Sequence, residues 1–142
     1  MPSSDLLTRQ RATQATLDKY RDRTWSWAEA TTCVHMTRFH LRKLGHKPEP
    51  LPRVRSLIGA KRALASRGWA GVADMLDDQP GLERIAPAQM LLGDLAAVPG
   101  TEGLGAIAIC AGPQKLLGWH EEGDGMVVLA VPIENIAGAW RV

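Results

Sequence analysis

One cysteine stands where the sequence predicts the start of a helix, a position at which a thiol is readily activated. Cys33 follows Thr31 and Thr32, two candidate N-caps, and precedes a periodic segment that Gly45 ends, so we expect a helix over residues 32–44. Unpaired N–H groups and the helix dipole favour a thiolate at such a position. The plain alternative is a small buried side chain, because cysteine is among the residue types most often buried.

A cysteine nucleophile needs a histidine from another element to accept its proton, and the sequence contains four histidines. His35 and His40 belong to the same predicted helix as Cys33, on different faces, so we expect no zinc site there. His46 lies in a proline-rich connector, where we expect a solvated side chain. His120 ends a predicted strand and is the best candidate base for Cys33, with an exposed hairpin residue as the alternative.

The elements that would position these residues change from helices to strands along the chain. Helical spacing predicts further helices, at residues 6–20, 56–67 and 71–77. From residue 85 onward the pattern is typical of strands, which we expect at 93–98, 104–110, 115–120, 126–131 and 139–142. Helices followed by an antiparallel meander predict an α+β fold, with N-terminal helices packed on a C-terminal antiparallel β-sheet.

The charges are divided unevenly between the two halves of this 142-residue chain. Residues 1–68 carry fourteen Lys/Arg and five Asp/Glu, a net charge of +9, whereas residues 69–142 carry a net charge of −7. The length suits one domain, and the composition excludes collagenous, disulfide-scaffold and disordered chains as well as a transmembrane helix. The cations are spread over three predicted helices without interleaved aromatic residues, so we expect protein partners rather than nucleic acid.

Tryptophan accounts for five of the seven aromatic residues. Burial is the plain interpretation, but tryptophan is also enriched at the energetic centres of protein interfaces. The interface candidates are Trp25, Trp27, Trp119 and Trp140, together with Arg141. The glycine-rich residues 100–105 lack the lysine and hydroxyl residue of a phosphate-binding loop, and we predict neither a metal nor an organic cofactor.

Four short motifs follow one another in order: a tryptophan-rich lead, Thr32-Cys33 at a helix start, Gly93-Asp94-Leu95 at a strand start, and the apolar segment 104–109. This order resembles the NlpC-type cell-wall peptidases, which have a papain-like fold. It looks closer still to a family of small phage and prophage proteins of unknown function, found among tail genes, that end in Ala-Trp-Arg-Val, as residues 139–142 do. The resemblance covers residues 17–142 and implies a helical arm at 1–22 and one NlpC-like domain at 23–142.

The resemblance assigns the nucleophile position to Cys33, but the partners of a catalytic cysteine have changed. Thr32 stands where the family usually has aspartate, and Gly103 stands where the alignment places the base histidine. Gly118 falls near the third polar position, two residues before His120. Because the parts of a catalytic triad act as a unit, a cysteine without its base keeps little of the rate advantage. The resemblance therefore supports the fold more than the activity.

Two functions are consistent with these residues. The first is a non-catalytic structural or assembly protein of a phage or prophage tail, a pseudoenzyme that binds other tail proteins or further copies of itself. The second is a cysteine amidase or endopeptidase that cleaves peptidoglycan peptides, with Cys33 as the nucleophile and His120 as the base. The N-terminal residues contain no apolar signal segment, so we expect synthesis in a bacterial cytoplasm, with the virion tail as the destination under the first function.

Overall fold

The protein was analysed as a computed structural model, which describes residues 5–50, 53–100, 103–113, 115–119 and 125–142. Four helices come first along the chain: α1 (Leu6–Tyr20), α2 (Cys33–Lys43), α3 (Leu57–Ser66) and α4 (Val72–Asp77). The strands follow: β1 (Glu83–Ile85), β2 (Leu95–Val98), β3 (Ala106–Gly112), β4 (Lys115–Trp119), β5 (Met126–Leu129) and β6 (Gly138–Arg141). The 3-10 helices η1 (Pro87–Gln89) and η2 (Ile133–Asn135) lie between strands. These findings confirm the α+β class.

The helices begin and end at the residues that local chemistry predicts. Asp5 caps α1 by accepting a hydrogen bond from the backbone N–H of Thr8 at 2.8 Å, and Ser56 caps α3 through the N–H of Gly59 at 3.1 Å. Gly45 follows α2 with a φ of 92°, in the left-handed region that glycine adopts without strain. The backbone N–H of the next residue, His46, then reaches back to the carbonyl of Leu41 at 2.9 Å. The predicted helix boundaries are confirmed to within one residue.

The sheet is antiparallel throughout, and its strand order is β1-β6-β2-β3-β4-β5. The strands β2 to β5 form the predicted meander. The sequence-based expectation of a simple meander is wrong at the other end, because β6 returns from the end of the chain and pairs with both β1 and β2. The short strand β1 was not predicted. Its three residues are too few to show the alternation of apolar and polar side chains that indicates a strand.

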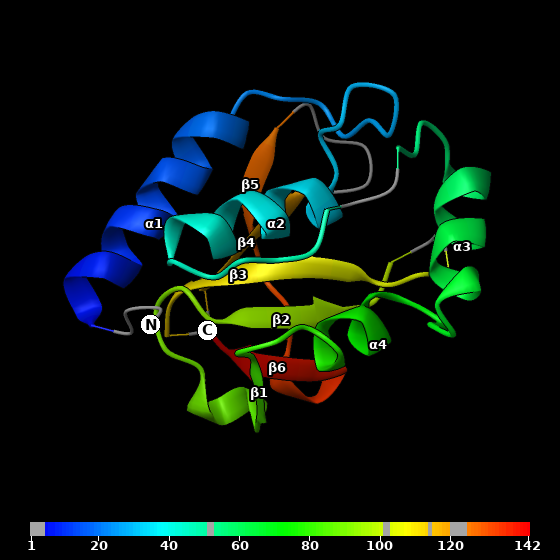
Figure 1. The fold of residues 1–142 in the computed structure, drawn as a ribbon. Coiled ribbons are helices and arrows are strands. Elements are labelled where there is room, and N and C mark those ends of the chain that lie inside the picture. Colours follow the sequence, from blue (N-terminus) through cyan, green and yellow to red (C-terminus); the bar gives the residue numbers. More distant parts are fainter. Residues whose placement is uncertain (1–4, 51–52, 101–102, 114, 120–124) are drawn as a thin grey trace.

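The sheet has two unequal apolar faces. Figure 1 shows α2 lying across one face, over β3 and β4, with α1 beside it. Side chains from this face, among them Ile107, Ile109, Leu117 and Trp119, form the main core together with the helices. The opposite face carries a smaller cluster, which consists of Ala96, Val98, Ala108, Cys110 and Leu116. The larger of the two apolar clusters therefore lies on the helix-covered face of the sheet.

Helix α1 shares this core with the rest of the chain. Ala12 and Tyr20 of α1 are buried with the residues of α2 and the sheet, and the guanidinium of Arg9 bonds the carbonyl oxygen of the last residue, Val142, at 3.0 Å. The residues expected to form a separate helical arm are thus packed against residues from both ends of the predicted domain. Within the described ranges, no helix is long and apolar enough to cross a membrane.

Candidate functional site

Cys33 is the first residue of α2, as predicted, and its side chain is buried. The preceding Thr32 has extended backbone angles but does not cap the helix through its side chain. Its hydroxyl instead lies 2.8 Å from Nδ1 of His35. The carbonyl of Cys33 accepts a hydrogen bond from the hydroxyl of Thr37 at 2.7 Å. The first turn of α2 therefore keeps backbone N–H groups without a side-chain cap, the arrangement that stabilises negative charge.

The sheet face beneath α2 carries apolar side chains where a cysteine hydrolase needs a base. Helix α2 packs on β3, whose core-facing residues are Ile107 and Ile109, and the next strand contributes Leu117 and Trp119. None of these four side chains can accept a proton. The described core-facing side chains of β3 and β4 therefore supply no general base on this face.

The two positions at which the resemblance places polar partners lie elsewhere. Gly103 lies in the loop before β3, with a φ of 79°, and a Cβ built on it would be nearest to Nζ of Lys61, at 3.8 Å. Gly118 of β4 belongs to the opposite face of the sheet. A Cβ at Gly118 would lie 3.6 Å from Cβ of Ala108 in the smaller cluster and 3.0 Å from Cδ1 of Leu129, which packs against that cluster. A polar side chain at Gly118 would therefore point away from Cys33.

The histidines have three different surroundings, and His120 lies outside the described residues. Half-buried His35 has its ring edge-on to Trp27, and burial lowers its pKa. His40 is fully buried, and its Nε2 donates to the carbonyl of Gly93 at 2.8 Å. Burial lowers the pKa of His40 to about 4. Its imidazole is neutral near pH 7 and links α2 to the strand region.

The expectation that His46 is solvated is wrong. Its side chain is buried against Gly81, where a Cβ would lie only 3.0 Å from Nδ1 of the ring. Its Nε2 has no hydrogen-bond partner among the described residues, and burial lowers its pKa. The connector that starts at His46 is anchored because α2 ends in a glycine turn that directs this side chain inward.

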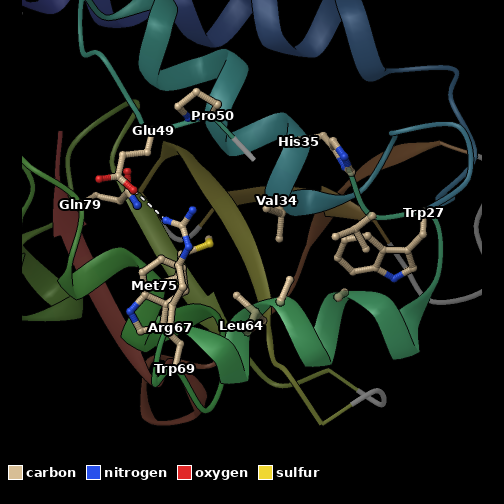
Figure 2. A pocket seen from close by; sticks show the side chains of 13 residues that line it. Trp27, Val34, His35, Glu49, Pro50, Leu64, Arg67, Trp69, Met75 and Gln79 are labelled. Atoms are coloured by element: carbon tan, nitrogen blue, oxygen red, sulfur yellow. Dashed lines mark hydrogen bonds and ion pairs between the residues drawn. The ribbon is translucent and has the colours of Figure 1, made fainter. Parts of the chain in front are cut away.

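A pocket lies beside the first turn of α2 (Figure 2). Its walls come from α2 (Val34 and His35), α3 (Leu64) and the residues after it (Trp69), with Trp27 at one end. At the other end Arg67 and Glu49 form an ion pair at 2.7 Å. The pocket is mainly apolar, so it suits an uncharged or aliphatic group. Val34 and His35, the two residues after Cys33, line the pocket, but Cys33 itself does not.

The five interface candidates occupy very different places. Trp25 and Trp27 are half-buried and pack edge-to-face on one another, at 6.1 Å between ring centroids. Trp119 is buried, with its indole N–H donating to the carbonyl of Arg23 at 2.7 Å. Trp140 is fully buried, and its indole N–H donates to Asp77 at 2.9 Å. The structure thus places Trp119 and Trp140 in the interior, since both find buried surroundings and an internal acceptor.

Arg141 belongs to a buried ionic cluster around Asp94, the central residue of the Gly-Asp-Leu motif. The carboxylate of Asp94 is fully buried and accepts from Arg9 Nη1 at 2.8 Å and from Arg141 Nε at 2.9 Å. The backbone N–H groups of Leu91 and Val142 complete its hydrogen bonds, at 2.8 and 3.2 Å. This cluster ties α1, β2 and β6 together. Sequence analysis missed Arg9, because an arginine in an amphipathic helix carries no sign of a partner 85 residues away.

Comparison with solved structures supports the NlpC-like fold. The NlpC/p60 domain of peptidoglycan hydrolase SagA is similar over 93% of this chain and 97% of its own, with a TM-score of 0.55 and 18% identity. The P60 domain of M. avium paratuberculosis antigen MAP1272c is similar over 94% of each chain, with a TM-score of 0.50 and 21% identity. At these identities the likeness shows the fold and nothing further. No curated protein sequence matches. A family model matches residues 6–142, and the chain therefore belongs to the family described as Domain of unknown function (DUF6950).

Proposed function

We propose that this chain is a non-catalytic assembly module built on an NlpC/p60-like scaffold, and that it works among the proteins of a phage or prophage tail. The observation that carries the first half of this proposal is Gly103, which has no side chain at the position that the resemblance assigns to the base histidine. The tail setting rests on the resemblance of the sequence, including the terminal residues 139–142, to proteins found among tail genes.

The residue at the position that the resemblance assigns to the base argues against hydrolysis. A cysteine nucleophile acts as a thiolate, and a base oriented beside it supplies that state and later protonates the leaving amine. Removing one member of such a unit costs nearly as much as removing all of them. The position that the resemblance assigns to the base is Gly103, which has no side chain and lies beside Lys61.

The surface supports a binding role instead. Trp25 and Trp27 are half-buried aromatic residues near the pocket of Figure 2, a type and exposure common at the centres of interfaces. The uneven charge of the two halves favours fast, salt-sensitive association with a partner of opposite sign.

The first experiment measures catalysis directly. The purified chain and its Cys33→Ser variant are incubated with peptidoglycan fragments, and released amino groups or peptides are quantified. We expect no release that depends on Cys33, and alkylation of Cys33 no faster than that of an unactivated thiol. Turnover that is present in the natural chain and absent from Cys33→Ser overturns the proposal.

The second experiment measures association. The chain is co-expressed with tail proteins encoded beside it, and complexes are separated by size at low and at high salt. We expect a defined complex with one of them, or a defined homo-oligomer, that Trp25→Ala or Trp27→Ala weakens. A protein that stays monomeric at low salt and binds none of its neighbours contradicts an assembly role.

A cysteine amidase or endopeptidase acting on peptidoglycan peptides is the second candidate, with Cys33 as nucleophile and His120 as base. The position of Cys33 at the start of α2, next to N–H groups without a side-chain cap, favours it. Its test compares His120→Ala with Cys33→Ala. If both variants abolish the same measurable hydrolysis, this second function replaces the first.

A further inference from the structure

Six cations from three segments of the chain line one open hollow beside α2. They come from the end of α1 and the residues after it (Lys19, Arg23), from α2 (Arg38, Arg42) and from the approach to α3 (Arg53, Arg55). Glu29 is the single acidic residue among the described residues of the lining. The sequence spreads these cations over more than thirty positions, and only the packing of α1 and of the connector against α2 brings them together.

The positive charge of this hollow is not neutralised within the described part of the chain. None of the six cations forms an ion pair with a described carboxylate. Two carboxylates close in sequence to these cations are engaged elsewhere, since Asp18 pairs with Arg21 and Glu49 pairs with Arg67. Arg38 donates only to a backbone carbonyl, that of Glu49, at 3.3 Å. Like charges held close together concentrate a positive potential that attracts an anionic ligand.

The composition of the lining indicates the chemistry of that ligand. Five of the six cations are arginines, whose planar guanidinium groups bind phosphate through two parallel hydrogen bonds. A protein surface usually mixes both signs of charge, whereas the described lining of this hollow has one carboxylate and six cations. We propose that this hollow binds the phosphate backbone of a nucleic acid, a class of partner that goes beyond the proposed assembly function.

A second copy of this chain fits the hollow less well. Two carboxylates of the acidic half are already neutralised internally, Asp94 by Arg9 and Arg141, and Asp77 by Arg84. These two of the ten acidic residues at 69–142 are therefore already paired and less available to the hollow of another copy. A phosphate backbone carries a charge at every nucleotide and needs no such matching.

The aromatic residues of the hollow point to backbone contact without base recognition. The ring of Phe39 is covered by Nζ of Lys19 at 4.4 Å and by Nζ of Lys43 at 5.4 Å. Tyr20 is buried in the core. Trp27, which also lines the hollow, packs edge-to-face with Trp25 and His35. Since these rings already have partners within the chain, we expect binding to be governed by salt rather than by base sequence.

The experiment compares two pairs of substitutions that remove the same charge. Arg42→Gln with Arg53→Gln changes two exposed cations of the hollow, and Lys61→Gln with Arg62→Gln changes two exposed cations of α3 outside it. Binding to fluorescently labelled duplex and single-stranded oligonucleotides is followed by anisotropy, between about 50 and about 200 mM salt. Thermal unfolding of each variant establishes that it is folded.

We expect the natural chain to bind with a strong salt dependence, and the hollow variant to bind about tenfold or more weakly, with a salt slope for duplex smaller by about 1.8. The control pair is expected to stay within about twofold of the natural chain. If the double variant of the hollow is unstable, Arg53→Gln alone serves, with a slope change of about 0.9.

Three results overturn the inference. One is no oligonucleotide binding at about 50 mM salt, where contacts to phosphate are strongest. Another is an equal loss of affinity in the hollow and control variants, which means that binding depends on the net charge of the chain and not on this hollow. The third is displacement of the oligonucleotide by poly-glutamate at the same charge concentration, which indicates an acidic protein segment as the occupant. Because none of these assays measures assembly or hydrolysis, their outcome is independent of the proposed function.

Discussion

At the scale of single residues, Asp94 has a structural role that its motif did not reveal. The Gly93-Asp94-Leu95 motif marks the start of β2. The carboxylate of Asp94 is a buried anion held by Arg9, Arg141 and two backbone N–H groups. Removing one partner of a buried pair leaves the others charged and desolvated, which costs more than the pair contributes.

Replacing this carboxylate therefore destabilises the fold strongly. Asp94→Asn leaves Arg9 and Arg141 without their counter-charge, and we expect a loss of about 3–5 kcal/mol in the free energy of unfolding. The exposed ion pair of Glu49 with Arg67 supplies the control, where Glu49→Gln is expected to cost at most about 1 kcal/mol. Urea unfolding of both variants measures the difference, and similar small losses would count against the buried cluster.

A pH effect follows from His40, whose folded-state pKa of about 4 lies below the ordinary value of 6.5. The unfolded chain binds a proton at this residue first, so stability is complete above pH 6.5 and is lost as pH falls towards 4. Between about pH 7.5 and about pH 5 we expect a loss of about 2 kcal/mol from this residue.

The matching variant is His40→Gln, whose amide can still donate to Gly93 but does not titrate. Urea unfolding of both proteins at the two pH values isolates the contribution of the imidazole. The variant is expected to lose less stability than the natural chain over this interval. Equal losses would assign the pH dependence to other groups.

At the scale of elements, local sequence signals predicted the four helices and five of the six strands. They did not predict which strands pair when the strands are distant in the chain. Capping residues and glycine turns mark the ends of α1, α2 and α3. These ends can be predicted because the hydrogen bonds that terminate a helix involve residues only a few positions apart. The place of β6 between β1 and β2 depends on a contact between distant segments. No period in the sequence encodes that pairing.

The cap of α3 allows a direct test of such a local signal. The hydroxyl of Ser56 accepts the N–H of Gly59 at 3.1 Å, and Ser56→Ala is expected to lower the free energy of unfolding by about 1 kcal/mol. Ser66→Ala at the other end of α3 is the control, because its exposed hydroxyl donates to a carbonyl that water can serve equally. Thermal unfolding of the pair checks the prediction, and equal stabilities would show that the cap contributes nothing.

At the scale of the whole molecule, the basic and acidic halves are parts of one packed unit. Arg9 in α1 donates hydrogen bonds to Asp94, the residue before β2, and to the carbonyl of Val142. Tyr20 packs edge-to-face on Trp119 at 5.7 Å. Helix α1 therefore packs against segments that the sequence assigned to the domain after residue 22.

Truncation distinguishes an appended arm from an integral helix. Without residues 1–22, the chain loses Arg9 and the core contacts of Ala12 and Tyr20, and we expect loss of the cooperative unfolding transition seen in the full chain. Circular dichroism during thermal unfolding measures this loss. A truncated chain that unfolds cooperatively near the transition temperature of the full chain would support the arm of residues 1–22.

The sequence by itself determined the class of fold, the elements and the placement of Cys33 at a helix start, because these follow from periodicity, caps and turns within a few residues. The tertiary structure decided which side chains meet. It placed apolar residues of β3 and β4 under Cys33, turned Gly118 to the opposite face, paired Arg9 with Asp94, and gathered six dispersed cations into one hollow. Such contacts depend on strand order and on how α1 and α2 pack, and residues distant in the chain carry no local mark of them.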